Sequence, residues 1–286
     1  METEDLAGRA YQPRIVDRRL EFLLQASGAV IIEGPRGCGK TMTGLHHCSS
    51  YALIDDPATN ELAHLAPESV LAGPRPRLLD EWQTALAIFN LARREIDRSA
   101  EPGQFILAGS AVPADNLTRH TGAGRFLRMR QRTLTLFEKA EYVPTVSLES
   151  LFNGEEPQPA ADQLSYGQVI ENLLLPGFPG YQRGNEQIVL AQLRGYLSEA
   201  ARSDMQRVAD LRVTPLATER LIASIARSTA AEVSVATLRK DLDPVSPNIS
   251  LPTVTKLLNS LQRIFVVEAI PCLLYTSDAA DDTPCV

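Results

Sequence analysis

The sequence predicts an α/β fold with a mostly parallel sheet, followed by a helical region and a winged helix-turn-helix. Short apolar runs alternate with amphipathic stretches up to residue 136, which is typical of strands separated by crossover helices. A glycine-rich loop separates the first apolar run from the stretch that follows it. Beyond about residue 145 the strand pattern fades, and helical periodicity replaces it.

Five short runs are expected to be strands, because each has an apolar centre and ends at charged, polar or glycine residues. They lie at residues 29–33, 51–54, 77–83, 104–108 and 132–136. Apolar residues at helical spacing predict helices at residues 11–27, 41–48, 61–71 and 84–99. Because strands and helices alternate, helices should cover a mainly parallel sheet.

The second half of the chain predicts mostly helices. Three helical segments and a strand-like run, the pattern of a winged helix-turn-helix, lie at residues 216–227, 235–242, 253–263 and 264–270. The expected domains are a core at 1–145, a helical lid or linker at 146–212, the winged helix at 213–271 and a tail at 272–286. The tail is polar and aperiodic, so it is expected to be disordered or a non-native extension.

Composition sets limits on the class of protein. The formal net charge is −7, so the chain as a whole is not a basic nucleic-acid binder, although a local basic face stays open. The four cysteines form no CxxC pair, which favours reduced thiols. The acidic N-terminus does not resemble a signal peptide, and no uncharged apolar run approaches the roughly 20 residues of a membrane span. A cytoplasmic protein without membrane contact is expected.

The strongest motif is Gly-x-x-x-x-Gly-Lys-Thr at residues 34–41, directly after the first predicted strand. Gly37 and Gly39 allow the backbone to curl so that successive N–H groups face one anion, and the following helix directs its first amides at the same place. This Walker A pattern predicts ATP binding; the competing interpretation is a glycine turn without phosphate. The expected ATP-binding residues are Gly34, Pro35, Arg36, Gly37, Cys38, Gly39, Lys40, Thr41 and Met42.

Specific roles follow from the chemistry of phosphoryl transfer. Lys40 should contact the β- and γ-phosphates, and Thr41 should ligate Mg²⁺. The run Leu78-Leu79-Asp80-Glu81 predicts that Asp80 holds the same ion through water as a Walker B acid, with Glu81 as the general base. A further strand, at residues 51–54, lies between the two motifs in sequence, which favours the additional-strand class of P-loop proteins. The alternative is an ordinary strand end with solvated carboxylates.

Two further residues are catalytic candidates. Ser110 follows the strand at 104–108 and could orient the attacking water; it could equally be a small residue that closes a strand. Arg125 lies in a glycine-bearing loop and could bring charge to the transferred phosphoryl group, in its own chain or from a neighbour. An arginine that pairs with an acid of its own domain is the alternative. Other arginines compete for the role, namely Arg119, Arg128 and Arg130.

The winged-helix candidate has a weak basic signature. Residues 214–271 hold six basic and five acidic side chains, and the expected recognition helix at 253–263 carries only Lys256 and Arg263. Such a balance leaves DNA binding and protein docking equally open.

Several motifs, taken in order, resemble those of a known family. They are Tyr11-x-Pro-Arg-x-x-Asp17, Glu33 to Thr41, Leu79-Asp-Glu-Trp-Gln83, Ile106 to Ala111, Leu136-Phe-Glu138 and Gly177-Phe-Pro-Gly180. The chain is similar to prokaryotic AAA-like ATPases, in which a winged-helix-like segment joins the ATPase core to a C-terminal domain of uncharacterised function. The resemblance implies ATP binding and hydrolysis, and it implies that the C-terminal domain is replaced here by the tail.

The expected function is therefore hydrolysis of ATP with Mg²⁺ to drive a conformational switch. An ATP-gated DNA or protein adaptor with negligible turnover is the main alternative. A nucleotide kinase is a weaker one, because the paired acids Asp80 and Glu81 favour water as the acceptor. An oligomer is compatible with all three interpretations.

Overall fold

The computed structural model describes residues 10–110, 122–139, 146–157, 164–181, 185–205 and 213–270. The chain divides into two units, one of residues 1–109 with 120–192 and one of residues 110–119 with 193–286. The expectations for Arg119, for Ala111 and for the tail at 272–286 concern positions outside the described residues. Each unit is described by itself below.

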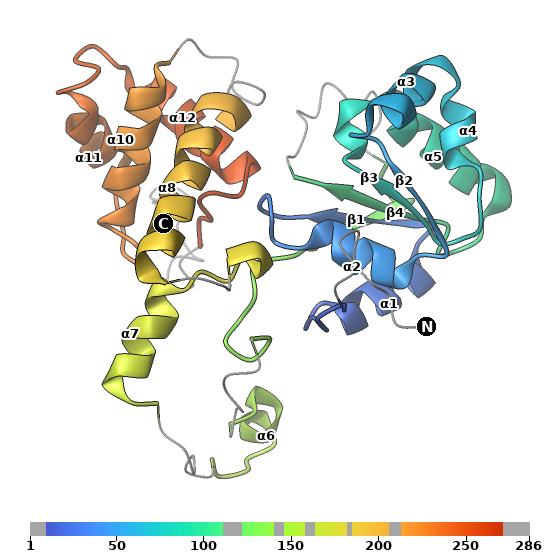
Figure 1. The fold of residues 1–286 in the computed structure, drawn as a ribbon, viewed down its shortest axis with the longest axis horizontal. Helices are drawn as coiled ribbons and strands as arrows, with labels where there is room; N and C mark the ends of the chain where they lie inside the picture. Colours follow the sequence, from blue (N-terminus) through green and yellow to red (C-terminus); the bar gives the residue numbers. More distant parts are fainter. Residues whose placement is uncertain are drawn as a thin grey trace, which may run out of the picture. The chain divides into compact units, whose positions relative to one another are not determined.

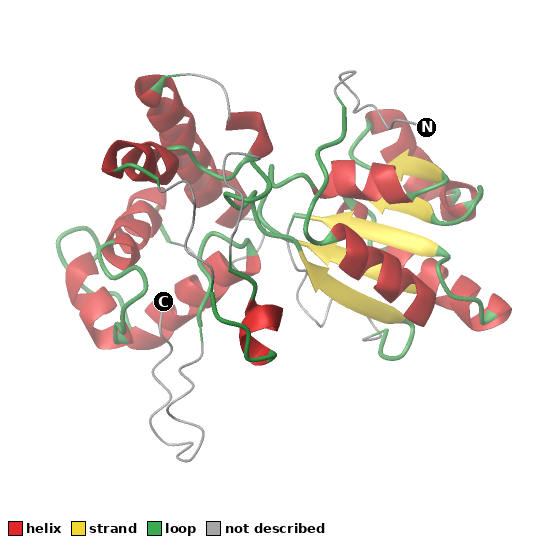
Figure 2. Ribbon diagram, turned by 90° about the horizontal axis from the view of Figure 1, so that it is seen from below, coloured by secondary structure: helices red, strands yellow, loops and turns green. Residues whose placement is uncertain are grey.

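The first unit is built on a parallel sheet of five strands (Figures 1 and 2), so the predicted α/β class is confirmed. The strands are β1 Ala29–Glu33, β2 Ser50–Leu53, β3 Arg77–Asp80, β4 Phe105–Gly109 and β5 Phe126–Arg130. Their order in the sheet is β2-β3-β4-β1-β5, and every neighbouring pair is parallel.

The position of β4 between β1 and β3 determines where functional loops begin. All five strands run the same way, so the loops after β1 and β3 leave the same edge of the sheet. Neighbouring strands are about 4.8 Å apart, and the ends of β1 and β3 are therefore separated by roughly 10 Å. The end of the glycine-rich strand β1 and the end of the acidic strand β3 therefore lie on either side of β4, at the same edge of the sheet.

Helices cover both faces of the sheet because the strands are apolar on both sides. One face packs against α3 Pro57–Leu65, α4 Pro67–Leu71 and α5 Ala87–Ser99; the other packs against α1 Asp17–Ala26 and α2 Lys40–His47 (Figure 1). In β1 the side chains of Ala29 and Ile31 belong to the first cluster, and those of Val30 and Ile32 to the second. The predicted helix at 61–71 is two helices, because Pro67 interrupts it and begins α4.

Trp82 is a core residue, as its predicted packing role requires. It is only 2% exposed, and its ring lies 5.2 Å from that of Phe89, which stacks on Phe126 at 4.5 Å. The aromatic row links the segment after β3, helix α5 and strand β5. It therefore holds the acidic end of β3 in a rigid setting.

Helix α2 approaches β3 closely because residue 44 is glycine. A Cβ at Gly44 would lie 2.6 Å from Cδ1 of Leu78, which is completely buried. Gly44→Val should therefore lower the free energy of unfolding by about 1–3 kcal/mol, measured by urea denaturation. Gly195→Ala is the control, because a Cβ there meets no atom within 4 Å; it should stabilise the chain by roughly 0.5–1 kcal/mol. An unchanged or increased stability of Gly44→Val would contradict the close contact.

The predicted fifth strand at residues 132–136 is wrong. The strand that pairs with β1 is β5, six residues earlier, where Phe126 and Met129 are buried and Leu127 and the arginines are not. Such an edge strand carries charge, which hides its pattern. Residues 132–136 leave the sheet because Leu134 donates to the Gly177 carbonyl at 2.6 Å and the amide of Thr135 donates to the Glu138 carboxylate at 2.8 Å.

Helices dominate the rest of the described chain, as predicted. They are α6 Leu148–Phe152, α7 Tyr166–Leu174, the 3-10 turn Pro179–Tyr181, α8 Glu186–Glu199 and the π-helical turn Ala200–Asp204. In the second unit, α10 Pro215–Ala226, α11 Val235–Leu242 and α12 Leu251–Arg263 surround one apolar core. The side chains of Thr214, Ser234 and Ser250 cap these three helices by accepting a backbone amide hydrogen bond.

The strand predicted at residues 264–270 does not form among the described residues. Helix α12 ends in a Schellman motif instead: Phe265 has φ 59° and donates to Gln262 at 3.0 Å, and Val266 donates to Leu261 at 3.0 Å. The valines that favoured a strand, Val266 and Val267, pack against the helical core. Of this run, only Ile270 forms a single β-bridge. No helix in the described part of the chain is long and apolar enough to cross a membrane.

Candidate functional site

The loop between β1 and α2 has the backbone shape of an anion cradle. Gly37 and Gly39 have φ of 77° and 99°, a region in which only glycine is unstrained. Alternation of such residues with ordinary ones turns successive N–H groups toward one point. Gly34 is required for a different reason, since a Cβ there would lie 2.0 Å from the carbonyl oxygen of Gln131.

Lys40 is the first residue of α2, and it is buried although it is charged. Its ammonium group donates to the carbonyl oxygens of Gly34 at 3.0 Å and Pro35 at 2.9 Å. Both acceptors belong to the glycine-rich loop, so the positive charge lies within the curl of that loop. A phosphate in the cradle would meet this charge and the N-terminal amides of α2 together.

Thr41 and Asp80 are brought together although they are far apart in sequence. The Thr41 hydroxyl donates to Asp80 Oδ2 at 2.8 Å and joins the start of α2 to the last residue of β3. A hydroxyl and a carboxylate are hard oxygen donors, the kind that Mg²⁺ selects. Among the described residues no group of three His, Cys, Asp or Glu side chains could hold a metal.

The electrostatics of Asp80 fit a cation site. Burial raises the pKa of Asp80 to about 6, and the charges of Glu81 and Asp55 add to that rise, whereas the Thr41 hydrogen bond and Lys40 oppose it. A buried carboxylate of this kind is costly to ionise unless a positive charge approaches it. A divalent ion at Asp80 would supply that charge. Burial likewise raises the pKa of the Cys38 thiol, so this cysteine stays protonated and unreactive near neutral pH.

Glu81 directly follows β3 in an unusual backbone conformation. Its φ of 49° and ψ of 38° are left-handed, which is uncommon for a residue with a side chain. Gln83 donates a hydrogen bond to Glu81 Oε2, so the carboxylate has a defined orientation. Backbone strain of this type concentrates at functional sites, because surrounding structure must hold it in place.

The two remaining catalytic candidates differ in position. Ser110 directly follows β4, at the edge of the sheet from which the phosphate loop leaves. Arg125 is at the opposite edge, since its carbonyl accepts from Ala29 at the start of β1 and its guanidinium pairs with Asp97 at 2.8 Å. Four residues of β1 separate it from Glu33, or roughly 13 Å. The structure therefore does not bring Arg125 to the phosphate loop of its own chain.

The competing arginines of β5 are nearer to the loop. Arg128 forms an ion pair with Glu33, the last residue of β1. Arg130 is aligned with Glu33 in the sheet register, so it lies at the edge where the loop begins. The glycine-bearing segment that suggested Arg125 precedes β5, so it lies at the end of the strand that is remote from the phosphate loop.

Sequence reasoning assigned no role to three buried polar residues that support the loop: Arg14, Gln131 and Glu138. Arg14 Nη1 donates to the Cys38 carbonyl at 2.8 Å, and Gln131 Nε2 donates to the same oxygen at 3.3 Å. Glu138 accepts from Arg14 Nε at 2.9 Å. The motifs around Tyr11 and Leu136 contain two of these residues, but local spacing gives no sign that they meet.

The segment Gly177 to Gly180 also contacts the phosphate loop. A Cβ at Gly37 would lie 3.8 Å from Cδ1 of Phe178, and one at Gly39 would lie 3.7 Å from Cγ of Pro179. Gly177 is held by its hydrogen bond with Leu134, and the Phe178 ring packs at 5.5 Å from that of Tyr181. The segment Gly177 to Gly180, which in sequence interrupts the helical pattern, therefore covers the phosphate loop in the structure.

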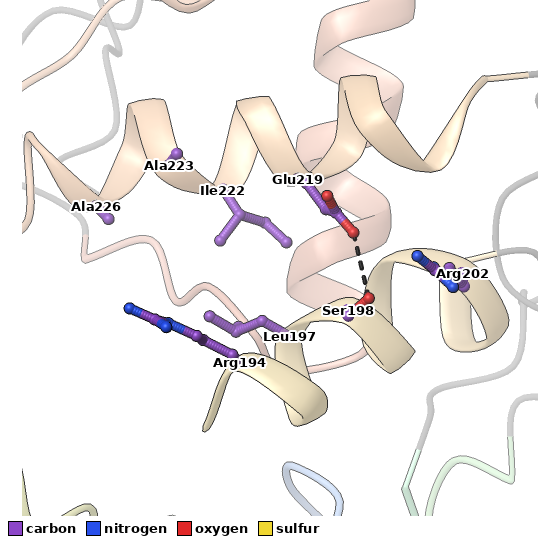
Figure 3. Close-up of a pocket in the computed structure, with 8 residues that line it drawn as sticks. All are labelled: Arg194, Leu197, Ser198, Arg202, Glu219, Ile222, Ala223 and Ala226. Atoms are coloured by element: carbon purple, nitrogen blue, oxygen red, sulfur yellow. Dashed lines mark hydrogen bonds between the residues drawn. The ribbon is translucent and has the colours of Figure 1, made fainter. Parts of the chain in front are cut away.

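The second unit has a groove of about 460 Å³ between α8 and α10 (Figure 3). It is lined by four apolar and four polar or charged side chains, namely Arg194, Leu197, Ser198, Arg202, Glu219, Ile222, Ala223 and Ala226. Ser198 donates to Glu219 across it at 3.3 Å. The groove contains no residue of the glycine-rich loop, so it is a separate feature from the candidate nucleotide site.

Comparison with known proteins agrees with this geometry. Residues 26–140 match the model of an AAA domain, and residues 168–280 match that of a domain of unknown function, DUF8612. A search of curated proteins gave no match. The parallel sheet and its glycine-rich loop form an α/β P-loop NTPase fold, and the AAA-domain match at residues 26–140 supports an AAA-like domain in this part of the chain.

The chain is similar to several solved structures at low sequence identity. A Walker-type ATPase of Pyrococcus abyssi is 14% identical with a TM-score of 0.51, and the match covers 92% of this chain and 91% of that one. DnaA of Aquifex aeolicus bound to AMPPCP is 16% identical with a TM-score of 0.33, covering 87% and 86%. The replication initiator DnaA bound to AMPPCP and single-stranded DNA is 15% identical with a TM-score of 0.37, covering 86% of each chain. The Pyrococcus likeness supports the P-loop fold alone.

Proposed function

We propose that this protein hydrolyses ATP with Mg²⁺ and uses the reaction as a conformational switch. The observation that carries the proposal is the 2.8 Å hydrogen bond between Thr41 and Asp80, at the junction of the glycine-rich loop and β3. A phosphate cradle alone would bind an anion. A hydroxyl and a buried carboxylate beside it add oxygen groups that can hold a divalent cation, and Glu81 adds a base.

Each residue has a role in the proposed reaction. The loop amides and Lys40 would bind the β- and γ-phosphates, Thr41 would ligate the ion, and Asp80 would hold it through water. The ion, when bound, neutralises charge that develops on the phosphate oxygens. Glu81, oriented by Gln83, accepts a proton from the water that attacks the γ-phosphorus in line. The bond to the β,γ-bridging oxygen breaks, and ADP leaves with that electron pair.

The covering segment suggests how hydrolysis becomes movement. Phe178 and Pro179 lie against the two left-handed glycines of the loop, and the segment continues into α8. A change in loop occupancy would press on or release this segment, which is the coupling a nucleotide switch requires. The proposal therefore assigns residues 146–212 the role of a lid or linker.

The first test is ATP–Mg²⁺ binding by Lys40→Ala. The substitution removes the buried ammonium group, so affinity measured with a fluorescent ATP analogue should fall by roughly tenfold or more. Lys240→Ala is the matched control, because Lys240 is exposed on α11 in the other unit. Equal affinities of Lys40→Ala and wild type would refute the assignment of the nucleotide site.

Two alternatives are separated by turnover. An ATP-gated adaptor would bind ATP but show negligible hydrolysis, so single-turnover measurements with and without DNA distinguish it from an ATPase. A nucleotide kinase would transfer phosphate to a panel of nucleosides or nucleotides instead of to water. The adjacent acids Asp80 and Glu81 support water as the acceptor.

We propose that a partner docks on the second unit, whose helices α10, α11 and α12 follow one another as in a helix-turn-helix, without the strand expected for a wing among the described residues. Of the charged residues of α12, only Lys256 is exposed; the helix buries Val254, Leu257 and Leu261. One exposed positive charge supports a protein partner over DNA.

If an arginine reaches the phosphoryl group from a neighbouring copy, Arg125 is the candidate, and turnover should then rise with protein concentration.

A further inference from the structure

The N-terminal segment before α1 contacts the phosphate loop through the side chain of Arg14. Arg14 is 8% exposed, and all three of its guanidinium nitrogens are engaged. Nε binds Glu138 at 2.9 Å, Nη1 binds the Cys38 carbonyl at 2.8 Å and Nη2 binds the Arg132 carbonyl at 2.8 Å. The guanidinium therefore ties the middle of the loop to the chain that returns from β5.

The bond to the Cys38 carbonyl determines the direction of the next amide. In a trans peptide the C=O and the following N–H point to opposite sides. Arg14 and Gln131 both donate to the Cys38 oxygen and hold it on the protein side of the loop. The N–H of Gly39 must then point to the other side, where the cradle opens. Gly39 has φ 99°, so without these donors its flanking peptide planes could rotate cheaply.

The charge of Arg14 is largely neutralised, which argues against a simple electrostatic role. Glu138 has a side chain 4% exposed, and it also accepts from the amides of Ile15 and Thr135, each at 2.8 Å. Burial alone would raise the pKa of Glu138, but these hydrogen bonds and the ion pair with Arg14 outweigh it and lower that pKa, so the pair is ionised at neutral pH. Glu138 thus fixes the guanidinium, and the guanidinium fixes the loop.

We propose that Arg14, oriented by Glu138, is a positioning residue that presets the Gly39 amide for the β-phosphate of the nucleotide. This inference rests on the proposed function, because it assumes that the loop binds ATP. Arg14 touches no reacting atom in this assignment. Its effect should appear in the affinity for nucleotides with a β-phosphate and not in the affinity for AMP.

The test compares ADP, ATP and AMP binding by wild type, Arg14→Ala and Arg14→Lys. We expect roughly 10- to 100-fold weaker ADP and ATP binding in both variants, with AMP binding unchanged. Millimolar guanidinium should restore ADP binding to Arg14→Ala, because it can refill the vacated site, and should not restore it to Arg14→Lys. Arg77→Ala is the control: Arg77 also donates to a carbonyl, that of Val70 at 2.7 Å, but at the opposite edge of the sheet.

The outcomes separate this inference from the proposed function. If wild type binds neither ADP nor ATP, the proposed function fails and the inference fails with it. If wild type binds both and either folded Arg14 variant binds ADP within twofold of wild type, only the inference is overturned. Weaker AMP binding of the same size, or a loss of affinity in Arg77→Ala, would mean general destabilisation and would also overturn it. Arg14→Lys keeps a cation beside Glu138, so the test stands if Arg14→Ala does not fold.

Discussion

Glu81→Gln should lower ATP turnover by roughly 10²- to 10⁴-fold while ATP affinity stays near that of wild type. The amide has the shape of the carboxylate but cannot take a proton from water. Its carbonyl oxygen can still accept the hydrogen bond from Gln83, and the left-handed backbone at residue 81 need not change. Steady-state phosphate release and equilibrium ATP binding, measured on the same preparation, separate loss of chemistry from loss of binding.

A matched control for Glu81→Gln is Glu68→Gln, a carboxylate exposed on α4 of the same unit. It should leave both measurements unchanged. Turnover of Glu81→Gln at the wild-type rate would show that another group activates the water. Weaker ATP binding in Glu81→Gln would instead mean that the left-handed turn after β3 has collapsed and disturbed Asp80.

The sequence was informative where function depends on neighbouring residues. The glycine-rich loop needs only residues 34–41 and the strand before them, so its shape follows from local chemistry. The alternation of strands and helices likewise predicted the class of fold, because parallel strands need crossovers. Asp80 was found through its place at the end of an apolar run. Thr41, 39 residues away, could be expected near Asp80 because the loops that follow parallel strands leave the same edge of the sheet.

The residues that were missed act across long separations. Arg14 and Glu138 are 124 positions apart, and neither lies in a pattern with a known period. The last strand was misplaced because edge strands tolerate arginines, whereas the run at 132–136 has the apolar alternation of a strand. The strand expected at 264–270 failed for a related reason. Valines favour strands only where a partner strand is available, and here the Phe265 turn directs them back onto the helices.

The ionised form of Asp80, which the proposed cation site needs, should lower the stability of the unliganded protein. Its pKa is raised from 3.8 to about 6 by burial, so the folded state holds a proton that the unfolded state has lost between these values. Stability must therefore fall as pH rises from about 4 to about 6. The loss is about 2–3 kcal/mol, since each pKa unit is worth about 1.4 kcal/mol. Above pH 6 the free energy of unfolding of the unliganded protein is lowered by this whole amount.

Asp80→Asn should consequently stabilise the unliganded protein at pH 7 by up to about 2–3 kcal/mol, because the neutral amide pays no such cost and its oxygen can still accept from Thr41. Urea denaturation at pH 4 and pH 7 tests this: the two proteins should be similar at pH 4 and differ at pH 7. The same variant should lose the Mg²⁺ dependence of ATP binding. A variant less stable than wild type at pH 7 would mean that the ionised carboxylate is satisfied by the fold itself, and the buried charge would then no longer argue for a cation at this site.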